Sequence, residues 1–181
     1  MKYVNFIIAL CAAWSVSAQR PVSAGGYVGG YDCNMAGEYT GEKSRSAVSG
    51  ALWVEWNAEP WFGLKSELSY LPRGGEIGEG IDLEANYLAF SLVPRLHLSE
   101  VSGGARLVAG VGVFTHLLAL GDREEFLSVP DVGTCVELGV EWRWFSILAK
   151  GQVGLLDAIE GLDKSQRWVG FGIGVEVPFF H

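Results

Sequence analysis

The alternation of apolar and polar residues near the C-terminus is the clearest pattern in the chain. In residues 168–180, large apolar side chains occupy every second position, and the positions between them are small or polar. The apolar positions are Val169, Phe171, Ile173, Val175, Val177 and Phe179, and those between are Gly170, Gly172, Gly174, Glu176 and Pro178. A repeat of two residues is typical of a β-strand, whereas each glycine in a helix would cost about 1 kcal/mol relative to alanine. The pattern predicts a closing strand with one apolar face and one narrow face.

The same alternation recurs along the chain and predicts further strands. They cover residues 24–35, 47–57, 61–70, 86–98, 105–118, 131–144 and 145–156, which makes eight with the last one. The connections between them alternate in length. Long, glycine-rich connections are expected at 36–46, 71–85, 119–130 and 157–167, and short ones at 58–60, at 99–104 and near 144–145. An even strand count with alternating long and short connections is typical of an up-and-down transmembrane β-barrel.

Alternation alone does not say whether the apolar face points outward into lipid or inward around an apolar ligand, as in a lipocalin. The narrow face favours the first interpretation. A water-exposed surface would carry Thr, Lys, Glu or Gln at most positions, whereas this face has glycine at 63, 110, 112, 133, 139, 170, 172 and 174. A barrel of eight strands has a lumen just wide enough for its own side chains, which favours small residues among the charged ones. Aromatic residues also lie near the expected strand ends, where interfacial girdles occur. These are Trp53, Trp56, Trp61, Trp142, Trp144, Phe145 and Trp168.

Charged residues on the narrow face are expected to fill the lumen. They are Lys65, Glu67, Arg95, Arg106, Asp131, Glu137, Glu141, Arg143, Lys150 and Glu176, five basic and five acidic. Buried charges must be paired, because each unpaired one costs several kcal/mol. A plug of ion pairs, with no open pore, is therefore the preferred interpretation over an ion path or a catalytic carboxylate pair.

The first 18 residues have the features of a secretory signal peptide. Lys2 precedes an apolar core at 6–14, and residues 16–18 form a small-residue cleavage site. We therefore expect a signal peptide at 1–18, a barrel domain at 19–181, and export to the outer membrane of a Gram-negative bacterium. No other stretch is apolar enough for a transmembrane helix.

Charge helps to define the partners. The net charge of −8 argues against nucleic acid. Acidic residues outnumber basic ones in 71–85 and in 119–130, which as extracellular loops are the candidate contact sites for a protein partner. The same loops could instead bind a cation or bridge to lipopolysaccharide, or simply be a solvated face. Membrane lipid and the barrel-assembly machinery are the other expected partners.

Candidate chemistry is sparse. The alternation places His97 and His116 on one face of adjacent strands, but pairing His97 with about Arg106 and His116 with about Tyr87 separates the histidines by roughly 30 Å at about 3.3 Å per residue. They cannot share a metal ion. The glycines at 170–174 resemble a nucleotide-binding loop, yet too few residues follow for its helix. We therefore assign no catalytic, cofactor-binding or metal-binding residue, and no cofactor.

The cysteines left after signal cleavage are expected to be free thiols. Cys33 lies late on the first strand and Cys135 early on the sixth, and the first strand neighbours only the second and the eighth. A disulfide requires Cα atoms within about 7 Å. The two could meet only across the lumen.

The segments WFGLKSELSYLPRGG and NYLAFSLVPRLHL resemble the hairpin of the PorT-like outer-membrane β-barrel family of Bacteroidetes. The matching positions are Leu68, Tyr70, Gly74, Gly75, Tyr87, Leu88 and Arg95. Ala89 and Ser91 depart from the family pattern, in which Glu and Pro are frequent, and Pro94 is displaced. The resemblance implies a cell-envelope barrel, and some members of the family are linked to secretion. It carries over no catalytic residue.

The function expected from these observations is a structural or interaction role in the outer membrane, without enzymatic activity. Two alternatives stay open. One is a lipid-modifying barrel enzyme, with His116 and Tyr87 near the outer rim. The other is a soluble periplasmic barrel that binds an apolar ligand.

Overall fold

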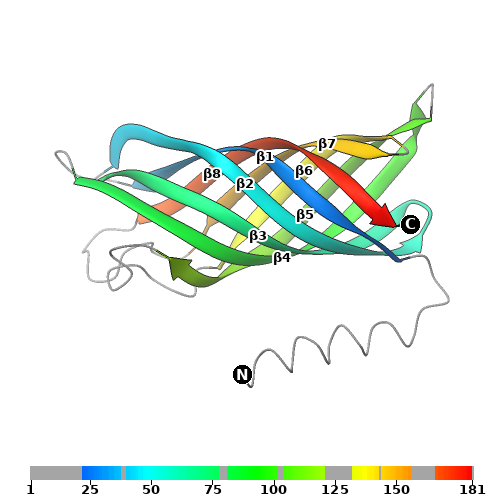
Figure 1. Cartoon of the computed structure of the whole chain (residues 1–181), viewed down its shortest axis with the longest axis horizontal. Coiled ribbons are helices and arrows are strands. Elements are labelled where there is room, and N and C mark those ends of the chain that lie inside the picture. The colour runs from blue at the N-terminus through cyan, green and yellow to red at the C-terminus, as the bar shows by residue number, and fades with distance from the viewer. Residues whose placement is uncertain are drawn as a thin grey trace, which may run out of the picture.

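In the computed structural model, the chain forms a closed barrel in which each strand pairs with the next and the last pairs with the first (Figure 1). All neighbouring pairs are antiparallel. The strands are β1 (Val22–Gly37), β2 (Thr40–Glu59), β3 (Phe62–Ile77), β4 (Ile81–Val101), β5 (Ala105–Leu120), β6 (Val132–Trp142), β7 (Phe145–Gly154) and β8 (Gln166–Phe180). The structure describes residues 22–37, 40–77, 81–101, 104–120, 132–142, 144–155 and 166–180. Within these ranges, no helix is both long and apolar enough to cross a membrane.

The predicted fold class, an all-β up-and-down barrel with a filled polar lumen, is confirmed. β1 begins and β8 ends at one end of the barrel, where Ala24 pairs with Phe180. The short connections β2–β3, β4–β5 and β6–β7 lie there too, so we call it the short-turn end. The opposite end, which carries the other four connections, we call the hairpin end.

Two of the four long-loop predictions are wrong. Most of 36–46 and 71–85 is strand, because β1 and β2 continue to Gly37 and Thr40, and β3 and β4 continue to Ile77 and Ile81. The pairing of β3 with β4 is unbroken from Phe62↔Leu96 to Ile77↔Ile81. A polar, glycine-rich sequence lacks the apolar alternation used to recognise a strand, but backbone hydrogen bonds between two arms of a hairpin do not need that alternation. The expected loop at 119–130 begins with β5 residues, and 121–130 lie outside the described part of the chain.

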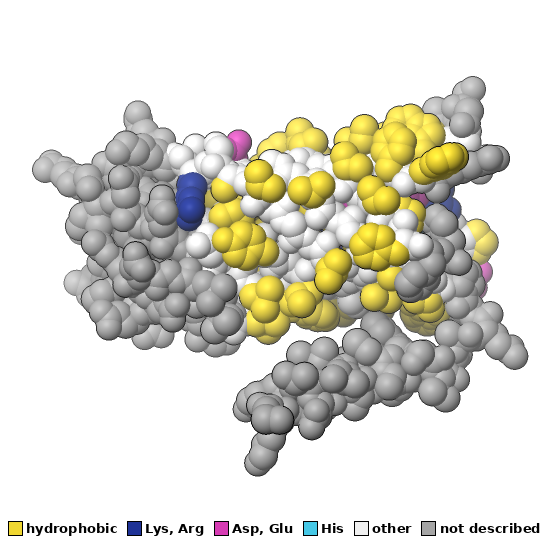
Figure 2. Space-filling model, viewed as in Figure 1, with side chains coloured by type: hydrophobic (Ala, Val, Ile, Leu, Met, Phe, Trp, Pro, Cys, Tyr) yellow, Lys and Arg dark blue, Asp and Glu magenta, His cyan; other side chains and the backbone are white. Residues whose placement is uncertain are grey.

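The apolar face of the strands points outward, so the lipocalin-like alternative is wrong. Along β8, side chains from Val169 to Phe179 are exposed at every second position, with Ile173 at 55%. That run, at about 3.3 Å per residue and a tilt of about 40°, gives a band about 25 Å tall, the height of the apolar band of outer-membrane barrels. Figure 2 shows apolar side chains across the middle of the visible face, with the few charged ones toward the ends.

The glycines on the inner face of β8 leave space for tyrosines of β1. Tyr27 and Tyr31 point into the lumen and are buried. A Cβ atom added at Gly170 would overlap Tyr31, and one added at Gly174 would lie 2.5 Å from Tyr27 Cε2. Aromatic rings of the neighbouring strand therefore cover positions 170, 172 and 174, which explains why these positions carry no larger side chains.

The aromatic residues do not all form a girdle. Trp61 and Trp144 are exposed at the short-turn end, with Trp142 and Phe145 close by. Trp53 is an exception and corrects the sequence prediction, because it lies inside the lumen and is only 6% exposed. It has the same strand parity as Ser49 and Glu55, and in a β-strand parity decides the face. The side chain of Trp168 lies outside the described side chains.

Candidate functional site

A cluster of six charged side chains fills the centre of the lumen. We call it the central charge cluster, and it consists of Lys65, Glu67, Arg95, Glu137, Lys150 and Glu176, from β3, β4, β6, β7 and β8. Its three acids and three bases are all nearly inaccessible to solvent. They reach the lumen because each lies on the inward parity of its strand.

Every cation of the central charge cluster contacts more than one carboxylate. Lys65 Nζ lies 2.7 Å from Glu67 Oε2 and 3.3 Å from Glu137 Oε1, and it also contacts Glu176. Arg95 Nη2 lies 2.6 Å from Glu137 Oε2 and 3.1 Å from Glu176 Oε2. Breaking one buried pair typically costs about 3–5 kcal/mol because it leaves a buried charge uncompensated. Shared partners and balanced charge therefore hold these long side chains in place across the lumen.

Lys150 closes the cluster on the hairpin side. Its Nζ lies 2.6 Å from Glu67 Oε2 and 3.8 Å from the centroid of the Tyr27 ring. A cation over an aromatic face is stabilised by the ring quadrupole, more strongly when water is excluded. The ring thereby adds to the carboxylates in stabilising the buried ammonium group.

A second cluster, around Arg73, lies between the central charge cluster and the hairpin end. Arg73 Nη2 donates to Gln152 Oε1 at 2.9 Å, and Tyr31 Oη donates to the same oxygen at 3.0 Å. The guanidinium also lies over the rings of Tyr87 and Phe114, at 5.9 and 5.4 Å from their centroids. All these side chains are buried, so the described lumen is closed toward the hairpin end.

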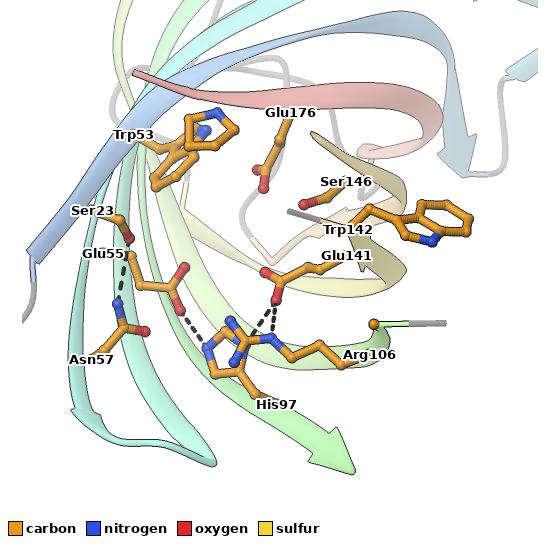
Figure 3. Close-up of a pocket in the computed structure, with 12 residues that line it drawn as sticks. Ser23, Trp53, Glu55, Asn57, His97, Arg106, Glu141, Trp142, Ser146 and Glu176 are labelled. Carbon is orange, nitrogen blue, oxygen red and sulfur yellow. Dashed lines mark hydrogen bonds and ion pairs between the residues drawn. The ribbon is translucent and has the colours of Figure 1, made fainter. Parts of the chain in front are cut away.

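The short-turn end is different, because a cavity of about 440 Å³ opens there (Figure 3). We call it the vestibule. Its lining residues are Ser23, Trp53, Glu55, Asn57, His97, Gly104, Arg106, Glu141, Trp142, Ser146, Glu176 and Pro178. Glu176 also belongs to the central charge cluster, which therefore forms the inner end of the vestibule. The described lumen is thus closed at its centre and open at the short-turn end.

Ion pairs line one wall of the vestibule. His97 bridges two carboxylates, with Nε2 2.8 Å from Glu55 Oε1 and Nδ1 3.2 Å from Glu141 Oε2. An imidazole donates from both ring nitrogens only when it is protonated at both. Arg106 Nε donates to Glu141 Oε2 at 2.6 Å, and Arg95 Nη1 lies 3.2 Å from Glu55 Oε2. Each of these carboxylates therefore already has a cationic partner.

The structure brings together most of the charged residues predicted for the lumen. Six form the central charge cluster and two, Arg106 and Glu141, line the vestibule, while Asp131 and Arg143 lie outside the described residues. The prediction of paired charges is correct for these eight, and the six residues of the central charge cluster form the plug. Glu55 and Arg73 were missed as plug residues, although their strand parity with Trp53 and Leu71 places them inside. The sequence does not indicate Arg73 because its segment lacks the apolar alternation of a strand.

The two histidines lie far apart in the register, as predicted, but the pairing differs in detail. His97 pairs with Val108 and His116 with Ala89, about two residues from the expected alignment. The offset arises because β4 continues to Val101, which pairs with Ala105, so the turn begins later than the predicted 99–104; the irregularity after His97 reduces the offset by one residue. His116 stacks on Tyr87 with ring centroids 4.4 Å apart. No cluster of three or more His, Cys, Asp or Glu suited to a metal ion occurs among the described residues.

Cys33 and Cys135 are both buried, and no disulfide joins them. Cys33 and Cys135 are 1% and 5% exposed and both have inward parity. The two strands that carry them, β1 and β6, are not neighbours in the barrel. Their thiols therefore contribute to lumen packing.

Comparison with known proteins identifies the fold. No family model matches the chain, and no curated protein sequence matches it. Several solved structures are similar at low identity, among them the following three. NspA, the Neisserial surface protein A, is 13% identical with a TM-score of 0.56, and the match covers 87% of this chain and 97% of NspA. OprG, an outer membrane protein of Pseudomonas aeruginosa, is 14% identical with a TM-score of 0.51, covering 88% and 95%.

The third is Ail, the attachment invasion locus protein of Yersinia pestis, at 13% identity and a TM-score of 0.50, covering 87% of this chain and 99% of Ail. That structure contains the heparin analogue sucrose octasulfate. The fold is that of a small outer-membrane β-barrel. At this identity the likeness extends to the fold alone, and the PorT-like assignment stays a resemblance.

Proposed function

We propose that the chain is an outer-membrane β-barrel protein of a Gram-negative bacterium, exported by the signal peptide at 1–18, with a structural or interaction role. The observation that carries this proposal is the combination of an apolar outer band about 25 Å tall with a lumen filled by ion pairs. Lipid requires that every backbone group be paired within the protein, and a closed barrel meets that requirement. The fold of OprG, itself an outer membrane protein, supports the same location.

The proposed role excludes an open pore. Lys65 and Arg95 cross the lumen with 0% and 1% exposure, and each is tied to carboxylates on other strands. Moving either would leave buried charges without partners, at a cost of several kcal/mol. The rigid barrel is then a support, and recognition takes place at its ends.

The hairpin end is the proposed contact region for a partner outside the cell. The hairpin formed by residues 71–85 carries more acidic than basic residues, and 119–130 has the same bias. Ail was crystallised with a polyanion. The acidic bias here favours a different ligand, either a basic protein surface or cations that bridge to lipopolysaccharide. Lipid around the barrel and the assembly machinery during insertion complete the proposed partners.

A lipid-modifying enzyme is the weaker candidate. It would require a reactive side chain open to lipid at the hairpin end. His116 is fully buried and packs between Tyr87 and Phe114, with ring centroids 4.4 and 5.1 Å away. That environment favours a packing role, and we assign no enzymatic activity.

Membrane fractionation tests the location. We expect the protein in the dense outer-membrane fraction, extracted only by detergent, and showing a faster-migrating folded band on unheated gels. Recovery in the soluble periplasm would refute the proposal. Reconstitution into planar bilayers should give no stepwise conductance, with a known porin as the positive control.

Crosslinking tests the interaction role. A photo-crosslinker placed at position 79 should capture a partner or lipopolysaccharide in intact cells. The same group at position 144, at the short-turn end, is the control. Equal capture from both positions, or none from either, would argue against a specific contact at the hairpin end.

A further inference from the structure

The β3–β4 hairpin extends past the neighbouring strand at the hairpin end of the barrel (Figure 1). β3 and β4 pair without a break as far as Ile77↔Ile81, whereas the pairing of β4 with β5 begins only at Asn86↔Leu120. Residues 81–85 of β4 therefore have β3 on one side and no described strand on the other. We call this stretch, which is about 16 Å long at about 3.3 Å per residue, the β4 edge.

The β4 edge has the backbone geometry that accepts another strand. In a paired strand, alternate residues direct their N–H and C=O groups to opposite sides, and those on an open side form a template for a further strand. Each residue from Ile81 to Ala85 pairs with a residue of β3, which keeps this backbone extended before any partner arrives. The stretch contains no glycine or proline that would interrupt pairing.

The charges of the chain itself disfavour closing the β4 edge from within. The register between β4 and β5, extended past its last pair, would set Asp122 opposite Glu84 and Glu124 opposite Asp82. Like charges directly opposite each other destabilise an antiparallel pair. A second copy of the chain is disfavoured for the same reason, because two antiparallel β4 edges centred on Leu83 would set acid against acid.

We propose that the β4 edge binds an extended segment of a partner protein that carries basic residues at every second position. Asp82 and Glu84 have the same strand parity, so basic residues two positions apart in an added antiparallel strand would lie opposite them. Backbone hydrogen bonds supply the affinity of such a complex, and the alternating charges supply its selectivity. The inference deepens the proposed contact at the hairpin end, and rests on it for the partner's location outside the cell.

Peptide binding to the purified, folded protein in a neutral detergent tests strand addition. The probe is a short capped peptide in which lysine alternates with valine, and we expect ligand-observed NMR to detect its binding. The same peptide N-methylated at every peptide bond, and the peptide with glutamate for lysine, should bind at least about threefold more weakly. Asp82→Lys combined with Glu84→Lys should reverse the preference to the glutamate peptide. Glu59→Lys, at an exposed position of the short-turn end, is the control and should change nothing.

Hydrogen exchange tests whether the β4 edge is open. In the wild type without peptide, backbone amides of residues 81–85 that face away from β3 should exchange rapidly, and the lysine peptide should protect them. Asp122→Lys combined with Glu124→Lys would turn both like-charge pairs into opposite-charge pairs. That variant should protect the same amides and lose peptide binding. The wild-type exchange remains decisive if the variant with Asp82→Lys and Glu84→Lys does not fold.

Several results would overturn the proposal. Protection of every amide of the β4 edge in the peptide-free wild type would show that the chain's own segment covers it. No binding of the lysine peptide, or equal binding of the N-methylated or glutamate peptide, would exclude charge-selective strand addition. Capture of a partner from position 79 in cells without peptide binding would preserve the proposed contact but refute strand addition. Selective peptide binding by a protein recovered in the soluble periplasm would support the edge site and refute the proposed location.

Discussion

Substituting alanine for Gly170 tests the packing of β1 tyrosines against the glycine face of β8. An added Cβ atom would overlap Oη and Cζ of Tyr31 and lie 2.9 Å from Cε1. Tyr31 is 4% exposed and donates to Gln152 Oε1 at 3.0 Å. It can avoid the new methyl group only by giving up that bond and its place in the lumen.

The expected cost follows from these contacts. Overpacking a filled interior costs about 1–3 kcal/mol, and losing one hydrogen bond costs about 1 kcal/mol. We therefore expect Gly170→Ala to lower the free energy of unfolding by about 2–4 kcal/mol. Gly30→Ala is the matched control, because Gly30 faces outward and a Cβ there would meet nothing within 4 Å. That control should be neutral or stabilising by up to about 1 kcal/mol.

A double-mutant cycle isolates the contact. Tyr31→Ala alone should destabilise the barrel by about 3–5 kcal/mol, as large-to-small aromatic substitutions do. When the ring is absent, Gly170→Ala should cost little, so the double variant should be more stable than the sum predicts by at least 1 kcal/mol. The assay is reversible urea unfolding in lipid vesicles, followed by tryptophan fluorescence. Additive effects, or equal costs at Gly170 and Gly30, would refute the packing argument.

Three further changes test other parts of the structure. Ile173→Arg should make the free energy of membrane assembly less favourable by about 2–4 kcal/mol, because Ile173 is exposed in the middle of the apolar band. A normal yield of the heat-modifiable folded band would contradict the assignment of Ile173 to the outer face. Deleting 178–181 removes the pairing of Pro178 and Phe180 with β1 and should leave the protein exported but unassembled, whereas deleting His181 alone should have little effect. Cys33 and Cys135 should react with a thiol reagent only after unfolding and without prior reduction, and labelling of the folded protein would show that the lumen is open.

Strand parity allowed much of this fold to be predicted from sequence. A period of two assigns each residue to a face without knowledge of its neighbours, and it placed Lys65, Glu137 and Ile173 correctly. The surrounding lipid then determines which face of each strand points outward, because large apolar residues such as Ile173 face outward only where the surroundings are apolar too. The even strand count and the glycine-rich narrow face followed from the same local pattern.

Other features depend on contacts between strands that are distant in sequence. Arg95 meets Glu137 and Glu176 because closure of the barrel brings β4, β6 and β8 around one lumen, and no spacing along the chain encodes that meeting. The glycines of β8 are explained only by Tyr27 and Tyr31 of β1, its neighbour through closure.

The vestibule and the hairpin arms are likewise determined by tertiary structure. Trp53 is a girdle residue by type, yet it lies in the lumen, beside a cavity whose walls come from several strands. The arms beyond Arg73 carry no apolar alternation, and only backbone pairing between β3 and β4 makes them strands. Sequence determines which face a residue occupies because parity is local, whereas partners across the lumen depend on closure and register, which are properties of the whole barrel.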